Sequence, residues 1–473
     1  MQHIYRVGLT LAAAALLLLP VIANAQPKRL KGWPVELPTG TFGGYVLLPM
    51  NGAALADLDG DGKRDIIASA GDKVWALHAD GKPLTGWPTT IKGSAQSPPA
   101  IGDIDGDGKL DVVQVGRGLR YSEPSTVNVF DATGKPLPGW PKTYANLIFH
   151  PPTLADLDGD GRSEIIVQIG HWPPKGTIEV LASDATLLLP MWSYDLDSYP
   201  LAATAVGDVD GDGKLDVAYL TKEKVSVRAA DGTMLEGFPV DAAMKREYTG
   251  ALVLADLDGD GKLDIIYCST EAGDGGKGVK LHALTAKGKS LAGFPMTLTD
   301  LDVPSPAPPS IGDLDGDGKL EIVVPIRGIG VVVVAADGSL VGKPMGDKNQ
   351  VDATVVLVDL DGDGKLELIT DRNLVDGPAG DPTGTPQEGY VDAYHHDGTL
   401  VSDFPLRITA NTMNNSIVVG DVDGDGALEL VVVSSSAVNP PSSWVSLWSL
   451  PGSSTKPAPP WPMHGAGLRR ANC

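Results

Sequence analysis

The chain has 473 residues, of which 42% are hydrophobic and only 5% aromatic, and its formal net charge at pH 7 is −23. This negative charge argues against nucleic acid or an anionic membrane as a partner and points towards cations. Glycine (58 residues) and proline (38 residues) are abundant, which favours many tight turns over long helices.

The first 25 residues have the pattern of a secretory signal peptide. Arg6 precedes the apolar run LTLAAAALLLLPVIANA, and Ala23-Asn24-Ala25 forms a small-x-small cleavage site before Gln26. An N-terminal core helix is the alternative. We expect cleavage after Ala25 and an extracellular or periplasmic protein whose residues 26–473 form a single domain. No later stretch reaches the roughly 18 apolar residues of a membrane span, so we expect no membrane insertion.

From Asp57 onwards, one acidic phrase recurs along the chain. The first copy reads ADLDGDGKRDII, and the later copies begin at Asp103, Asp156, Asp208, Asp256, Asp313, Asp359 and Asp421. These eight copies lie 46 to 62 residues apart. Such a period is typical of a fold built from repeated supersecondary units.

A second sequence mark alternates with the acidic phrase. It reads GWP in the first three copies, and its central residues are Trp33, Trp87, Trp140, Trp192, Phe238, Phe294, Lys343, Phe404 and Trp461. Before each mark, segments such as VFDATGKPLPGW carry an ADG or ATG step, which predicts a tight turn between two short strands.

Each repeat therefore predicts a strand, the acidic loop, a second strand, a connection, a third strand, a turn and a fourth strand. Apolar runs such as DVVQV and EIVVP are short and β-branched, which favours buried strands. We predict an all-β chain, a β-propeller of four-stranded antiparallel blades, with eight blades preferred over seven because all eight loops are intact. An array of separate modules and a linear β-solenoid are the alternatives, but no linker separates the repeats.

The acidic loop has the chemistry of a metal site. Counted from its first acid, every copy has carboxylates at positions 1, 3, 5 and 9, with glycines at positions 4 and 6 that permit positive-φ turns. A loop of carboxylate oxygens suits the six to eight flexible ligands of Ca²⁺ better than the strict octahedron of Mg²⁺. Position 7 varies in type, so we expect it to contribute its main-chain carbonyl. The loop is not an EF-hand, because position 12 is not a fixed Glu and a strand follows at once.

We therefore predict up to eight bound Ca²⁺, one per repeat. The predicted ligand residues, at positions 1, 3, 5, 7 and 9 of each copy, are Asp57, Asp59, Asp61, Lys63 and Asp65; Asp103, Asp105, Asp107, Lys109 and Asp111; Asp156, Asp158, Asp160, Arg162 and Glu164; Asp208, Asp210, Asp212, Lys214 and Asp216; Asp256, Asp258, Asp260, Lys262 and Asp264; Asp313, Asp315, Asp317, Lys319 and Glu321; Asp359, Asp361, Asp363, Lys365 and Glu367; and Asp421, Asp423, Asp425, Ala427 and Glu429.

The repeated D-x-D-G-D-G-x-x-[D/E] loop with its following hairpin resembles the FG-GAP/VCBS repeat of integrin α-subunits and of many bacterial secreted proteins. The resemblance covers about residues 30 to 465. It implies a β-propeller whose loops bind Ca²⁺ between the first and second strands of each blade. Propellers of this family commonly have seven blades, so a seven-bladed ring would leave one repeat outside it.

The connections between second and third strands differ in length. They are short in repeats one, four and six, whereas the longest run from Arg372 to Tyr390 and from Ser434 to Trp444. In an antiparallel blade these connections lie at the end opposite the acidic loops, and variable loops on a rigid scaffold often carry function. We hypothesise that Tyr121, Trp172, Tyr390 and Trp444 help to line a face that binds a protein or glycan. Packing of these aromatic residues against the ring is the alternative.

These patterns favour a binding module over an enzyme. A propeller-type polysaccharide lyase, for which Arg120, His150, His171 and Arg246 are candidates by position, is the main alternative. A quinone-dependent dehydrogenase is a weaker one. His395-His396 lies in an HHDG turn, which favours a solvated hairpin over a transition-metal site. Cys268 and Cys473 are too few for a disulfide scaffold, and the sequence leaves open whether they pair.

Overall fold

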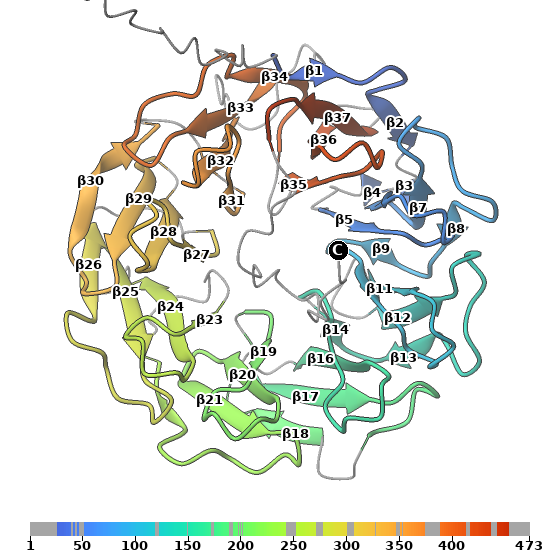
Figure 1. Ribbon diagram of the computed structural model, residues 1–473. Helices are drawn as coiled ribbons and strands as arrows, with labels where there is room; N and C mark the ends of the chain where they lie inside the picture. Colours follow the sequence, from blue (N-terminus) through green and yellow to red (C-terminus); the bar gives the residue numbers. More distant parts are fainter. Residues whose placement is uncertain are drawn as a thin grey trace, which may run out of the picture.

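The computed structural model describes residues 26–38, 41–42, 45–46, 52–118, 123–148, 150–171, 175–188, 193–196, 198, 200, 202–242, 252–270, 278–299, 307–326, 328–346, 351, 353–373, 388–412, 417–436 and 442–453. Eight antiparallel sheets stand around a central axis in chain order (Figure 1). The predicted eight-bladed β-propeller is confirmed, and no helix occurs among the described residues.

The strands of the first four blades follow the acidic repeats. Their bounds are β5 (Ala53–Ala56), β6 (Asp65–Ala70), β7 (Lys73–Leu77) and β8 (Thr89–Thr90) in blade 1; β9 (Ser94–Ala95), β10 (Ala100–Gly102), β11 (Asp111–Arg117), β12 (Ser125–Phe130) and β13 (Lys142–Tyr144) in blade 2; β14 (Leu147–Ile148), β15 (Thr153–Ala155), β16 (Glu164–His171), β17 (Lys175–Leu181) and β18 (Ser193–Leu196) in blade 3; and β19 (Ala205–Gly207), β20 (Asp216–Leu220), β21 (Lys224–Ala229) and β22 (Val240–Asp241) in blade 4.

The remaining blades repeat this order, and a small two-stranded sheet precedes blade 1. The bounds are β23 (Val253–Ala255), β24 (Asp264–Thr270), β25 (Val279–Leu284) and β26 (Met296–Thr299) in blade 5; β27 (Ser310–Gly312), β28 (Glu321–Ile326), β29 (Gly330–Ala335) and β30 (Leu340–Met345) in blade 6; β31 (Val356–Val358), β32 (Glu367–Asn373), β33 (Glu388–Tyr394) and β34 (Leu406–Thr409) in blade 7; β35 (Ile417–Gly420), β36 (Leu428–Ser436), β37 (Ser442–Leu450), β1 (Lys28–Arg29) and β2 (Val35–Pro38) in blade 8; and β3 (Thr41–Phe42) with β4 (Tyr45–Val46) in the small sheet.

The ring closes through the first strands of the chain. β1 and β2 both pair with β37, so the N-terminal segment supplies the outer edge of the last blade (Figure 1). Arg29 reinforces this closure, because its guanidinium donates to the carbonyl of Arg407 at 2.9 Å and lies 5.0 Å from the ring centre of Trp448. This pairing joins strands from the two ends of the described chain.

The core lies between neighbouring blades. The second strand of a blade is buried on both faces, and β6 is buried along its whole length. Ile66 belongs to the cluster shared with Val431 of blade 8, whereas Ile67 belongs to the cluster shared with Val112 of blade 2. Alternate residues of one strand therefore serve two seams, which explains why these strands are apolar on both faces instead of alternating with polar residues.

The aromatic marks join the outer ends of neighbouring blades. Trp87 of blade 1 donates its indole N–H to the carbonyl of Ala132, in the hairpin turn of blade 2, at 3.0 Å. Trp33 and Trp140 make the corresponding bond to the blades that follow them. Gly86 must be glycine here, because a Cβ on it would lie 2.0 Å from a carbonyl oxygen of that turn. The mark is therefore an inter-blade contact.

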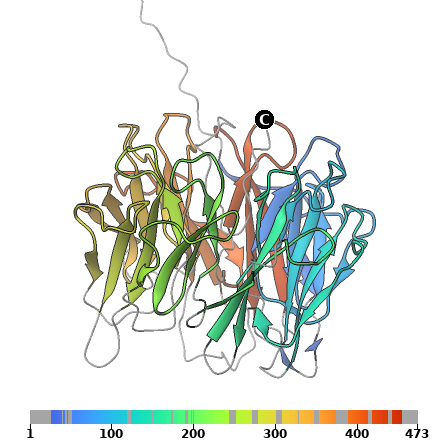
Figure 2. The ribbon, with the colours of Figure 1, turned by 90° about the horizontal axis from the view of Figure 1, so that it is seen from below.

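The loops gather at the two ends of the blades, as the edge-on view in Figure 2 shows. Because the strands alternate in direction, the acidic loop and the hairpin turn after the third strand lie at one end, and the second connection lies at the other. Repeats one, four and six have the short second connections that the sequence predicts: β6 to β7, β20 to β21 and β28 to β29.

Several predictions concern residues outside the described ranges, including the signal peptide 1–25, Trp192, Trp461 and Cys473. Cys268 lies in β24 as a free thiol with no exposed surface, and burial raises its pKa to about 12. Within the described residues, no helix has the length and hydropathy needed to cross a membrane.

Candidate metal loops

Each acidic loop connects the first strand of a blade to the second. In blade 1 it follows β5 and ends at Asp65, the first residue of β6. Position 1 accepts the main-chain N–H groups of positions 4 and 6, as Asp57 does from Gly60 at 2.8 Å and Gly62 at 2.9 Å. Both glycines have positive φ, at 77° and 87°, as the predicted curled loop requires. The same pair of bonds recurs at Asp103, Asp208, Asp256, Asp313, Asp359 and Asp421.

Position 9 folds back over the start of its own loop. One oxygen of Asp65 accepts the N–H of Leu58 at 3.1 Å, and the corresponding bond is present in all eight repeats. These carboxyl groups are buried, with Asp65 only 2% exposed. Burial and, to a smaller extent, the neighbouring acids raise the pKa values of these groups, whereas the hydrogen bond lowers them. The net result is a pKa of about 6 for Asp65 and about 7 for Asp111 and Glu429.

The loop brings carboxylates at positions 1, 3 and 9 together. One oxygen each from Asp57, Asp59 and Asp65 lie within 4.8 Å of one another. Equivalent groups form in blades 2, 3 and 4, at Asp103, Asp105 and Asp111, at Asp156, Asp158 and Glu164, and at Asp208, Asp210 and Asp216. The position 5 carboxylate accepts the N–H of position 7, as Asp61 does from Lys63 at 2.8 Å. The acids at positions 1, 3 and 9 therefore converge locally, and position 5 is not part of these groups.

The donor set fits a hard divalent cation. In blade 8 the second oxygen of Glu429 is buried and makes no hydrogen bond among the described residues, although the other oxygen accepts from Val422 at 2.7 Å. A buried carboxylate oxygen without a partner is costly, and a cation bound by the loop would satisfy it. Positions 1, 3 and 9 would hold that ion, with oxygen ligands of the kind Ca²⁺ prefers. Calcium bound there would neutralise acids that otherwise repel one another.

Position 7 has a contact that sequence reasoning missed. Lys262 in blade 5 donates from its ammonium group to the carbonyl of Asp210, in the loop of blade 4, at 2.7 Å. Lys63 lies against Gly424 of blade 8, and Arg162 lies against Gly106 of blade 2. The signal was present in the sequence, because seven of the eight position 7 residues are Lys or Arg. Lys262, Lys63 and Arg162 thus each contact the loop of the preceding blade.

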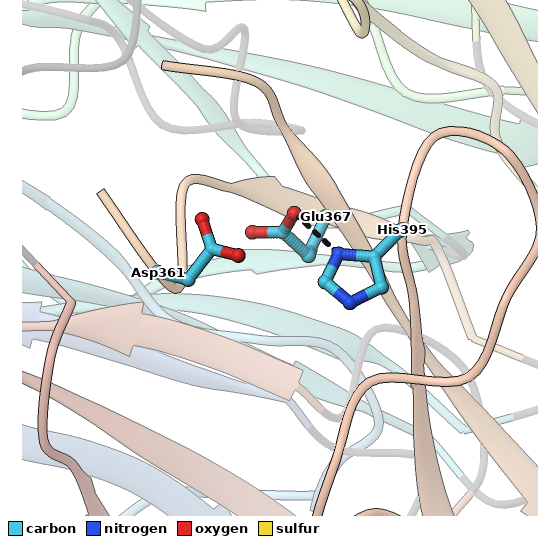
Figure 3. Close-up of side chains that lie close together, drawn as sticks. All are labelled: Asp361, Glu367 and His395. Atoms are coloured by element: carbon cyan, nitrogen blue, oxygen red, sulfur yellow. Dashed lines mark hydrogen bonds and ion pairs between the residues drawn. The ribbon is translucent and has the colours of Figure 1, made fainter. Parts of the chain in front are cut away.

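Two loops receive a histidine from the hairpin turn of the same blade. His395 Nδ1 lies 3.1 Å from Glu367 Oε1, and the group Asp361, Glu367 and His395 offers three ligand atoms within 4.8 Å of one another (Figure 3). In blade 1, His78 Nδ1 lies 3.2 Å from Asp65 Oδ1. The HHDG segment forms the predicted hairpin turn, and His395 keeps 31% of its side chain exposed while it contacts Glu367. The choice between a solvated hairpin and a metal site stays a prediction.

The predicted ligand face is only partly described. Tyr121 and Trp172 lie outside the described residues. Tyr390 and Trp444 lie within strands β33 and β37, at the end opposite the acidic loops, so the long connections are shorter than the sequence indicated. The strands extend because pairing continues past the apolar core. Tyr390 packs under Arg372, whose guanidinium carbon lies 4.7 Å from the ring centre.

Of the four lyase candidates, the structure describes only the side chain of His150. Arg120 and Arg246 lie outside the described residues, and His171 ends β16. His150 Nε2 lies 3.3 Å from the carbonyl oxygen of Pro200, and burial lowers the pKa of this imidazole to about 4. His150 is therefore neutral at pH 7.

One solved structure supports the fold at low sequence identity. The chain has 15% identity and a TM-score of 0.63 to the V. cholerae biofilm matrix protein Bap1, with 92% of each chain covered. The exotype rhamnogalacturonan lyase YesX has 14% identity and a TM-score of 0.47, with 90% of each chain covered. The C-terminal WD40 domain of Sif2 has 12% identity and a TM-score of 0.47, covering 90% of this chain and 99% of that one.

No curated protein matches the chain in sequence. The FG-GAP-like repeat family matches residues 57–113, 208–267 and 256–324, each of which begins at position 1 of an acidic loop. These matches fall in blades 1, 2, 4, 5 and 6, and the same loop and hairpin recur in the remaining blades. The chain is an eight-bladed β-propeller that contains FG-GAP-like repeats.

Proposed function

We propose that this protein is a secreted, calcium-stabilised propeller that acts as a binding module for a protein or glycan. The observation that carries the calcium part is the position 9 carboxylate. It is buried and held through one oxygen by its own loop, and in blades 1 to 4 it lies in one group of possible ligand atoms with the acids at positions 1 and 3. Calcium at the loops would hold the ring rigid, because position 7 side chains and main-chain bonds such as Ser163 N–H to Asp103 O, at 2.8 Å, connect successive loops.

The calcium part is tested by counting bound ions. The full mature chain is stripped with chelator, dialysed against Ca²⁺ and analysed by metal analysis and calorimetry. We expect up to eight Ca²⁺ per chain, and one fewer in Glu429→Gln, which keeps size but removes the charge. Asp337→Asn is the matched control, because Asp337 is exposed in a hairpin turn on the same face and lies outside the loops. Equal stoichiometry in the wild type and Glu429→Gln would exclude the blade 8 loop as a site.

The second half of the proposal concerns the partner, which would bind on the face opposite the acidic loops. The support is the regularity of the loop face, set against second connections that differ in length from blade to blade. The similarly folded Bap1 is a biofilm matrix protein, so a matrix glycan or protein is the first ligand class to test. A glycan array and pull-down in Ca²⁺ and in chelator identify the ligand. Replacing Tyr121, Trp172, Tyr390 and Trp444 together should abolish its binding, and retained binding would remove this face.

A further inference from the structure

The acidic loops differ in whether the hairpin turn of their own blade places a histidine against them. The hairpin turn after the third strand begins with the same hydrogen bond in each of blades 1 to 7. The first residue of the turn donates its N–H to the carbonyl of the residue four places later, so the seven turns can be compared residue by residue. This aligned position is His in blades 1 and 7, but Asp131, Ala182, Ala229, Thr285 and Ala335 in the blades between. Only blades 1 and 7, of these seven, place an imidazole at their loop.

The imidazole faces the carboxylate oxygen that the loop itself leaves available. In blade 7, Glu367 Oε2 accepts the N–H of Leu360 at 2.6 Å, and Glu367 Oε1 faces His395 Nδ1 at 3.1 Å (Figure 3). Asp361 completes a group whose three ligand atoms lie within 4.8 Å of one another. Two ligands that each lie about 2.1 Å from a common tetrahedral zinc ion are separated by about 3.4 Å. The observed N–O distance of 3.1 Å is that of a hydrogen bond, so the two groups would have to move apart by only a few tenths of an ångström to admit the ion.

The arrangement occurs twice with different carboxylates. Position 9 is Glu367 in blade 7 and Asp65 in blade 1, yet the imidazole-to-carboxylate distances are 3.1 and 3.2 Å. In blade 1, Asp59 Oδ2 also lies 4.0 Å from His78 Nδ1. His395 and His78 retain 31% and 37% side-chain exposure, so an ion can reach both from solvent.

Ligand chemistry then separates the two classes. Calcium binds oxygen ligands almost exclusively, whereas imidazole with carboxylates suits a borderline ion such as Zn²⁺. We infer that the loops of blades 7 and 1 form mixed nitrogen–oxygen sites that take Zn²⁺, with Asp361, Glu367 and His395 as ligands in blade 7 and Asp59, Asp65 and His78 in blade 1. This inference rests on the proposed function in treating the acidic loops as metal sites. When Zn²⁺ is present, it leaves the other six loops for Ca²⁺.

The test measures Zn²⁺ stoichiometry on the full mature chain, by calorimetry and metal analysis, in the presence of excess Ca²⁺. The wild type should bind two more Zn²⁺ than the double variant His78→Ala/His395→Ala, and His395→Ala should lose one. His396→Ala is the matched control, because His396 is the next residue in the same turn but contacts Lys365 and faces the hollow beside the blade 6 loop instead of Glu367. It should retain both sites. Equal Zn²⁺ binding by the wild type and His395→Ala would overturn the blade 7 site and leave the contact with Glu367 as an ion pair.

A gain-of-site variant guards against misfolding of the loss variants. Ala229 occupies the aligned position in blade 4, beside the acid group Asp208, Asp210 and Asp216. Ala229→His should therefore add one Zn²⁺, and no added site would contradict the geometry. The outcome is separable from the calcium proposal. If Ca²⁺ leaves the melting temperature unchanged but Zn²⁺ binding still depends on His395, the calcium proposal fails and the zinc site stands.

Discussion

Two interfaces between neighbouring blades, the seam of blades 1 and 2 and the seam of blades 6 and 7, are built from the same repeat. They differ in how well their outer ends are packed. At the first, Trp87 is 6% exposed and Leu84 is 4% exposed, and Trp87 meets Phe130 edge-on at 6.2 Å. At the second, Lys343 stands in the aromatic mark, and Leu340 and Val341 are 57% and 39% exposed. The outer end of this seam is therefore open among the described residues.

The difference follows from one missing residue. The segment from the turn glycine to the mark proline spans 88 − 81 = 7 steps in blade 1 but 344 − 338 = 6 in blade 6. Blade 6 instead forms a continuous β30, and Met345 takes the place of the aromatic ring against Gly398 of the next turn. Leu314, Val341 and His396 then line a hollow beside the blade 6 loop. The aromatic residue of the mark therefore reaches the next blade only when the segment between the turn glycine and the mark proline has its full length.

The largest expected effect comes from what the two seams share. Both have an acidic loop, so chelation should weaken both, and a site held at 100 times its Kd contributes about 2.7 kcal/mol. The melting temperature should fall on adding chelator and recover with Ca²⁺. Hydrogen exchange should rise in β11 and β32 alike. An unchanged melting temperature would contradict the metal assignment, and exchange confined to β32 would show that only the open seam depends on metal.

The next effect is pH dependence of the metal-free protein, again common to both seams. Burial raises the folded pKa of Asp111 from 3.8 to about 7 and that of Asp65 to about 6. The folded state therefore holds more protons than the unfolded chain between about pH 4 and pH 7, so its free energy of unfolding should fall as pH rises through this window. Calcium requires ionised carboxylates and should stabilise more at pH 7.5 than at pH 5. Denaturant unfolding at both pH values checks this, and a rise with pH in chelator would refute it.

A substitution at the closed seam should separate the two seams. Trp87→Ala removes a buried indole and its hydrogen bond to Ala132, and we expect a loss of about 3–5 kcal/mol in the free energy of unfolding. Trp87→Phe should lose only the hydrogen bond, about 0.5–1.5 kcal/mol. The control at the open seam is Lys343→Ala, which removes an exposed side chain and should change stability by less than about 0.5 kcal/mol. Comparable losses of stability in Trp87→Ala and Lys343→Ala would show that the two seams do not differ in how much their marks stabilise the fold.

The smallest expected effect is a gain from repairing the open seam. Replacing residues 339–344 with KPLTGWP, the sequence of residues 82–88, restores the length and the aromatic residue. Burying the equivalent of Val341 should add about 1.5–3 kcal/mol to the free energy of unfolding. Urea unfolding and reduced binding of a hydrophobic dye measure the change. A scrambled insert of the same length should give no gain, and a gain from that insert would show that length alone seals the seam.

The repeat and the local curl of the acidic loop could be predicted from the sequence. The spacing of the eight loops and the apolar second strands predict the blades, because each such strand must be buried on both faces. Positions 1, 3 and 9 converge in Asp57, Asp59 and Asp65 for a local reason. Hydrogen bonds within nine residues and two positive-φ glycines curl the loop without help from the rest of the chain.

The contacts between segments that are distant in the sequence became visible only in the folded ring. Ring closure pairs Lys28 with Ser449, and His395 reaches Glu367 across 28 residues. Lys262 reaches Asp210 across 52 residues, although its position seemed free to vary. Strand pairing and blade packing bring these residues together, and neither is encoded in any short window of sequence. Local turn chemistry therefore specified the loops, whereas non-local packing specified which side chains surround them.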